Sequence, residues 1–294
     1  MNRAPLEEPD GAHAILYIYI YILWKVRDCS SNSAWRTSRL GHWDLLKMIR
    51  ENGQLISPLL QAPWVDTSIF RVDWLHCADL GVTADWLGSQ FIMISKKLPG
   101  RSRKVQCQAL WGLMQDFYKS DSVTDRLQGF RPSMLQMPGK APKLRASAAQ
   151  CRALVPFASK LSQERLDAAD HIEAAARRGM MSLHECYRAL SKDSIFASDV
   201  LKAQSTSFAQ QYVALEHAHR TESGKMYKIK PKLHMFLELC SDGSKPALFW
   251  NYRDEDWGGS VARMSRSRGG AKNPKSFSQN VLWRFQIQQP MIRM

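Results

Sequence analysis

The stretch Phe70-Arg71-Val72-Asp73-Trp74-Leu75-His76-Cys77-Ala78-Asp79-Leu80-Gly81 decides how the rest of this chain is interpreted. The overlapping segment Ile69 to Leu75 is rich in β-branched and aromatic residues, which predicts a strand. Functional side chains commonly follow strand ends in open α/β sheets, and here Asp73 and His76 occupy that place. The stretch therefore predicts a sheet edge that carries an acid and a histidine.

Two later segments contain the same residue types. Pro231-Lys232-Leu233-His234 opens an amphipathic run, and Trp250-Asn251-Tyr252-Arg253-Asp254-Glu255-Asp256 places three carboxylates among aromatic residues. Carboxylates and histidines are common ligands of divalent metals. The three segments together predict a divalent-metal site assembled from distant parts of the chain.

Charge is the most informative feature of the composition. The 294 residues, 45% of them apolar, suffice for one large domain or two ordinary ones, and 41 Lys and Arg against 27 Asp and Glu give a net charge of +14. Between Lys96 and Arg152 lie 12 basic and 3 acidic residues, and between Glu255 and Met294 lie 7 and 2, while the remainder is neutral. Such basic regions are typical of surfaces that bind nucleic acid, although a merely soluble basic protein would show them too.

Cysteine spacing indicates the redox environment. The six cysteines lie tens of residues apart with no C-x-x-C pair, which disfavours a zinc ribbon or a disulfide scaffold. We therefore expect free thiols and an intracellular location, nuclear or cytoplasmic. The sequence also contains no P-loop, H-E-x-x-H or G-x-S-x-G motif, so we expect no small-molecule cofactor.

The N-terminal region, residues 1–32, contains an apolar run from Ala14 to Trp24. This run is shorter than the ~20 residues of a spanning helix, and Glu7 and Glu8 precede it where a signal peptide would be basic, so a membrane partner is not expected. Alternating Tyr and Ile is what a TA repeat in DNA encodes. We interpret the region as low-complexity or as a mispredicted gene start.

The middle of the chain predicts helices. Apolar residues recur at helical spacing from residue 101 to 228, for example Phe208, Tyr212 and Leu215 in the long candidate helix Ile195 to Arg220. Another stripe runs from Leu233 to Cys240. The pattern over residues 101–228 indicates a large all-helical block.

The three quoted segments resemble a group of multi-copy predicted proteins of dinoflagellate algae. More remotely, over about residues 36–270, the chain is similar to the cores of CACTA-like and hAT-like cut-and-paste transposases. The resemblance implies an α-rich α/β fold, in which a partial RNase H-like core is interrupted by a large helical insertion. The expected parts are the first part of the core at 33–100, the insertion at 101–228, the last part of the core at 229–265 and a basic tail at 266–294.

The resemblance also implies roles for single residues. Asp73, His76 and Glu255 would be catalytic, and Asp73, His234 and Glu255 would hold Mg²⁺ or Mn²⁺, provided the site is intact. The family needs an earlier catalytic Asp on the first strand, and the candidates upstream of Asp73 lie in no apolar strand: Asp10, Asp28, Asp44 and Asp66. We therefore expect a catalytically incomplete piece; an intact site would act as a metal-dependent DNA nuclease or strand transferase.

Structural roles compete with these assignments. His76 can hydrogen-bond the adjoining loop, His234 can pair with Glu238 four residues on, and Glu255 can complement a helix dipole in the first turn. If the three residues have these structural roles, the chain has no catalytic site.

The leading hypothesis is a transposase-like, DNA-binding remnant of a mobile element, with oligomeric state left open. Its expected DNA contacts are six basic residues: Arg101, Arg103, Lys104, Arg263, Arg266 and Arg268. The alternatives are a non-enzymatic helical module that binds nucleic acid or protein, and a decayed fragment. A central sheet would favour the first hypothesis, and a sheetless helical bundle the second.

Overall fold

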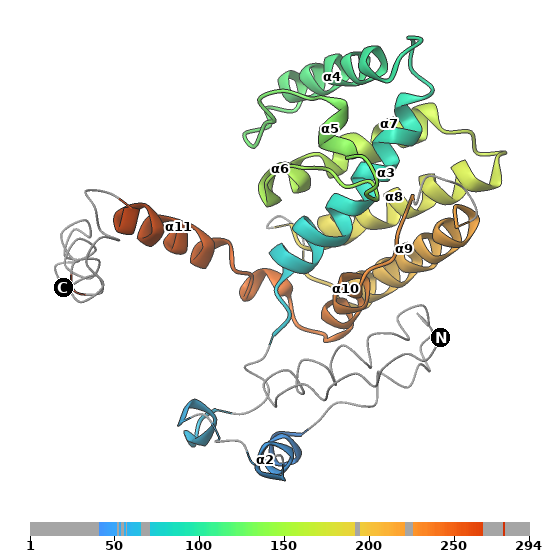
Figure 1. Cartoon of the computed structure of the whole chain (residues 1–294). Coiled ribbons are helices and arrows are strands. Elements are labelled where there is room, and N and C mark those ends of the chain that lie inside the picture. Colours follow the sequence, from blue (N-terminus) through green and yellow to red (C-terminus); the bar gives the residue numbers. More distant parts are fainter. Residues whose placement is uncertain are drawn as a thin grey trace, which may run out of the picture. The chain divides into compact units, whose positions relative to one another are not determined.

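A computed structural model describes residues 41–51, 53, 56, 58–65, 71–191, 195–220, 226–266 and 279 (Figure 1). The chain divides into two compact units, Met1–Phe249 and Trp250–Met294. In the part so described every regular element is helical and no strand occurs. The predicted α/β fold with a partial RNase H-like core is therefore wrong.

The helices of the first unit follow one another through its whole described length. They are α2 (His42–Glu51), η2 (Pro58–Gln61), η4 (Leu75–Thr83), α3 (Ala84–Ser95), α4 (Arg103–Ser120), α5 (Pro132–Leu135), α6 (Ala148–Ala153), α7 (Val155–Arg165), α8 (His171–Ala189), α9 (Ser198–Ala218), α10 (Pro231–Ser241) and η5 (Pro246–Leu248). The second unit contains α11 (Tyr252–Arg266).

The strand predicted over Ile69 to Leu75 is the local source of the error. Residues 71–73 have no regular structure, helix begins at Trp74, and Ile69 and Phe70 lie outside the described residues. The Asp73 carboxylate accepts hydrogen bonds from the backbone N–H groups of Leu75 and His76, which is how a capping residue starts a helix. A helix-start signal therefore overrides the β-forming composition.

Helix α3 is the centre of the first unit. All 12 of its residues are buried, and it packs against η4, α4, α5 and α7. A helix that is covered on every face must be apolar or internally satisfied all round. Its sequence supplies large apolar surfaces at Trp86, Leu87, Phe91 and Ile94, all fully buried.

Two glycines allow neighbouring segments to approach α3. A Cβ at Gly88 would lie 2.4 Å from the backbone nitrogen of Lys143, whose segment crosses the helix there. A Cβ at Gly179 of α8 would lie 2.4 Å from the Trp86 ring. Only a residue without a side chain fits at either crossing.

The polar residues of α3 find partners inside the core. Tyr227 donates its backbone N–H to the Ser89 hydroxyl at 3.1 Å and its own hydroxyl to the Gln90 side-chain oxygen at 2.9 Å. Gln90 in turn donates to the Ser162 hydroxyl at 2.8 Å. Buried polar groups are tolerated when they are hydrogen-bonded, so this network fixes the loop before α10 onto α3.

Aromatic rings fill the space between α3 and α9. The Trp86 ring lies 4.8 Å from Phe208, 5.3 Å from Tyr212 and 4.9 Å from Tyr227, measured between ring centroids. Phe208 and Tyr212 belong to the predicted helical block, so helices of that block share a core with α3. Among the described helices, none is long and apolar enough to cross a bilayer.

The crossing at Gly88 yields a direct test of this packing. Gly88→Ala should force the Lys143 backbone away from α3 and lower the free energy of unfolding by about 1–3 kcal/mol, measured by urea denaturation. Gly112→Ala in α4 is the matched control, because its Cβ would meet nothing within 4 Å and alanine should stabilise the helix by about 0.5–1 kcal/mol. Equal effects of the two substitutions would contradict the close crossing.

Candidate functional site

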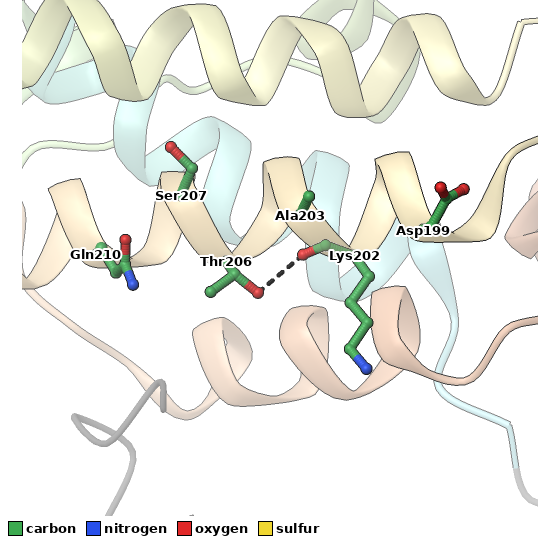
Figure 2. Close-up of a pocket in the computed structure, with 6 residues that line it drawn as sticks. All are labelled: Asp199, Lys202, Ala203, Thr206, Ser207 and Gln210. Carbon is green, nitrogen blue, oxygen red and sulfur yellow. Dashed lines mark hydrogen bonds between the residues drawn. The ribbon is translucent and has the colours of Figure 1, made fainter. Parts of the chain in front are cut away.

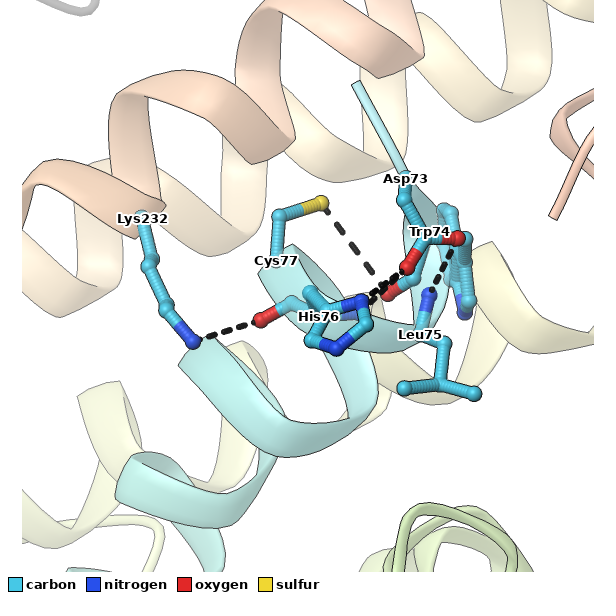
Figure 3. A network of polar contacts seen from close by, with 6 residues as sticks. All are labelled: Asp73, Trp74, Leu75, His76, Cys77 and Lys232. Carbon is cyan, nitrogen blue, oxygen red and sulfur yellow. Dashed lines mark hydrogen bonds and ion pairs between the residues drawn. The ribbon is translucent and has the colours of Figure 1, made fainter. Parts of the chain in front are cut away.

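Asp73 and His76, which the sequence predicts to act together, do lie together at the start of η4 (Figure 3). Asp73 Oδ2 is 2.5 Å from His76 Nδ1 and 3.0 Å from the His76 backbone nitrogen, and Oδ1 is 3.3 Å from the Leu75 nitrogen. The Asp73 side chain is 12% exposed and His76 49% exposed. Both Asp73 oxygens are thus engaged in starting the helix and orienting the imidazole.

Helix η4 is wound as a π-helical turn and is kinked at Gly81, where φ is −105° and ψ is −109°. π-Turns of this kind frequently occur at functional sites. A Cβ at Gly81 would lie 2.8 Å from the Lys232 side chain and 3.1 Å from the His76 carbonyl oxygen. The kink therefore brings a lysine of α10 against the backbone of η4.

Two lysines donate to backbone carbonyls of this kinked helix. Lys232 Nζ lies 2.7 Å from the His76 oxygen, and Lys143 Nζ lies 2.8 Å from the Leu80 oxygen (Figure 3 shows the Lys232 contact). Side chains that bond to carbonyls at a break in the helical ladder stabilise the kink. Both lysines are half-buried.

A third lysine joins them through Asp85, at the start of α3. Lys230 Nζ lies 2.7 Å from Asp85 Oδ1, and the Asp85 side chain is 6% exposed. Burial raises the pKa of Asp85, while the hydrogen bond and charge of Lys230 oppose that rise. Burial, and next to it the charge of Lys143, lowers the pKa of Lys232. We call Lys143, Lys230 and Lys232 the lysine cluster.

A second acid of the quoted stretch is fully buried. Asp79 Oδ1 accepts a hydrogen bond from the Tyr187 hydroxyl at 2.5 Å, and that hydroxyl lies 2.7 Å from Thr83 Oγ1. Burial raises the pKa of the neighbouring Cys77 thiol well above its ordinary value, so this cysteine is not an activated nucleophile. Both residues join η4 to the core.

His234 pairs with Glu238, which is the structural role predicted as the alternative to metal binding. It is buried on α10, and its Nε2 lies 3.8 Å from Glu238 Oε2, one turn along the same helix. The described residues include no group of three or more His, Cys, Asp and Glu side chains arranged to hold a metal ion. Glu255 is exposed in the first turn of α11, in the second unit. A metal site formed by Asp73, His234 and Glu255 stays a prediction.

The chain was compared with protein-family models, curated proteins and solved structures. None of them matches. The likeness to transposases therefore depends on the quoted segments alone.

The predicted DNA contacts of the first unit lie on one surface segment. Arg101, Arg103 and Lys104 are all exposed at the start of α4, whose first turn has no acidic residue. Within the described part of the chain, none of the three forms an ion pair. Arg263 is exposed on α11 and donates to the Ser260 hydroxyl; the side chain of Arg266 and all of Arg268 lie outside the described residues.

A shallow depression lies on the surface of α9 (Figure 2). Its lining comes from one helix alone, namely Asp199, Lys202, Ala203, Thr206, Ser207 and Gln210. The Thr206 hydroxyl donates to the Lys202 carbonyl of the same helix at 2.8 Å. Ligand pockets are usually enclosed by several elements, so we assign this depression no ligand.

The lysine cluster was not predicted from the sequence. One signal was visible: Lys230-Pro231-Lys232 places two cations at the start of a helix, where acids are favoured by the dipole. Lys143 carries no such signal, because it comes near η4 through long-range contacts of its segment: the crossing at Gly88 and the hydrogen bond from the Leu144 N–H to the Ala84 carbonyl at 2.7 Å.

The capping geometry predicts how Asp73 contributes to stability. Asp73→Ala removes the side-chain acceptor of two backbone N–H groups and should lower the free energy of unfolding by about 1 kcal/mol, measured by thermal denaturation. Asp73→Asn keeps an acceptor oxygen and should cost clearly less. Equal losses in both variants would show that the contact with the His76 ring, not the cap, determines the role of Asp73.

Proposed function

We propose that this chain is a non-enzymatic helical module that binds the phosphate backbone of nucleic acid through exposed basic residues between Lys96 and Arg152. The observation that supports the proposal most is the group Arg101, Arg103 and Lys104, which is exposed and has no acidic neighbour in the first turn of α4. Uncompensated cations attract phosphates and release their counterions. The helical architecture without a sheet in the described residues agrees with such a module.

The proposal assigns no catalytic step to the chain. The two Asp73 oxygens are used by the helix start and by His76, and His234 faces Glu238. A Mg²⁺ or Mn²⁺ ion at Asp73 would have to displace those contacts. The DNA partner and the mobile-element origin implied by the resemblance fit a binding remnant better than a nuclease.

The thiols support an intracellular setting for this function. Cys77, Cys107, Cys151, Cys186 and Cys240 are all free and buried. Burial raises the pKa of Cys151 to about 12, so it stays protonated at neutral pH. A reducing compartment, nuclear or cytoplasmic, keeps such residues as thiols.

The salt dependence of duplex DNA binding tests the proposal. Each phosphate contact contributes about −0.9 to the slope of log affinity against log salt, so the double variant Arg103→Gln, Lys104→Gln should flatten the slope by about 1.8. The double variant Lys202→Gln, Lys228→Gln is the charge-matched control, because both lysines are exposed elsewhere. An identical change in both variants would mean that only net charge matters, and no binding at low salt would refute the proposal.

The basic residues of the C-terminal unit can be tested in the same assay. If they also contact phosphates, replacing Arg263, Arg266 and Arg268 with Ala should reduce the slope by up to about 2.7. An unchanged slope would restrict DNA binding to the first unit.

A further inference from the structure

The lysine cluster brings three positive charges together around one carboxylate. Three ammonium groups surround one carboxylate, that of Asp85. Among the described residues they form one ion pair, the 2.7 Å contact of Lys230 with Asp85. The three lysines and Asp85, counted by themselves, carry a net charge of +2. Like charges held together in a partly buried place repel one another strongly unless an anion joins them.

The three ammonium groups converge although their residues are distant in sequence. The carbonyls of His76 and Leu80, which accept from Lys232 and Lys143, lie on one helix four residues apart. The charges of both these lysines act on Asp85, the partner of Lys230. The charges of Lys143 and Lys230 also act on Lys232, so the three ammonium groups share one neighbourhood.

Each ammonium also retains donors. A lysine has three N–H donors, and the contacts described use one donor of each residue. The Lys230 side chain is 37% exposed, and Lys143 and Lys232 are half-buried. The unused donors can therefore meet a ligand that arrives from solvent.

We infer that the lysine cluster binds the dianion of a phosphomonoester. A monoester phosphate carries nearly two negative charges at pH 7 and three acceptor oxygens, which matches a balance of +2 and three ammonium groups. A phosphodiester carries one charge and would leave the cluster half-compensated. The ligand is either a small phosphate ester or the terminal phosphate of a nucleic-acid strand, and binding here does not require the surface at Arg101–Lys104.

Isothermal titration with two small probes at equal ionic strength tests this inference. Methyl phosphate should bind one site per chain, and dimethyl phosphate at least about tenfold more weakly, since it lacks the second charge. This comparison uses the unaltered protein and does not depend on the folding of any variant. No saturable binding of methyl phosphate, or equal binding of both probes, would overturn the inference.

Variants then locate the site. Lys232→Gln and Lys143→Gln keep an amide donor for the backbone carbonyl but lose the charge, and each should weaken methyl phosphate binding about tenfold. Lys228→Gln is the matched control, because Lys228 is exposed in the same segment, and it should bind as the unaltered protein does. Equal losses in Lys228→Gln and Lys232→Gln would show general attraction and contradict a defined site.

Two oligonucleotides identify the source of the phosphate. A single strand with a 5′-phosphate should bind more tightly than its 5′-hydroxyl twin, with the difference lost in Lys232→Gln, if the ligand is a strand terminus. Equal binding of both strands, with methyl phosphate binding intact, would assign the site to a small phosphate ester. Either result supports the site, and neither depends on duplex binding, whose failure would refute only the proposed function.

Discussion

The complete burial of α3 is the constraint on which the first unit depends. Neighbouring segments cross a helix that is covered on all sides at close range. Gly88 and Gly179 make two of these crossings possible because they have no side chain. The polar side chains of Ser89 and Gln90 would be costly in such a place if Tyr227 and Ser162 did not bond to them. Apolar packing and a small hydrogen-bond network therefore support one another around the same helix.

The kink at Gly81 links this core to the surface. It occurs just before α3, where the Lys232 side chain approaches the backbone closely enough that a Cβ would collide with it. The same kink places two backbone carbonyls where cationic side chains can reach them. The kinked helix thus brings together Lys143 and Lys232, which belong to two distant segments of the chain.

Local patterns predicted helices well and their arrangement poorly. The helical spacing of Phe208, Tyr212 and Leu215 lies within α9, and the stripe from Leu233 to Cys240 lies within α10. The expected strand was wrong over residues 71–75, because the prediction followed the β-forming residues and ignored Asp73, whose carboxylate starts a helix. The contact between Asp73 and His76 could be predicted because the two residues are three positions apart. Their partner at Lys232 was not visible, since sequence spacing does not reveal a contact made across 156 positions.

The bond between Ser89 and Tyr227 spans 138 positions, and this separation has a consequence for synthesis of the protein. Translation at ~5–20 residues per second would release α3 from the ribosome roughly 7–28 s before the residue that covers it. During that interval α3, the most apolar of the described helices, would lack its final neighbours. A chaperone that holds exposed apolar segments would find its substrate in the nascent chain rather than in the finished protein.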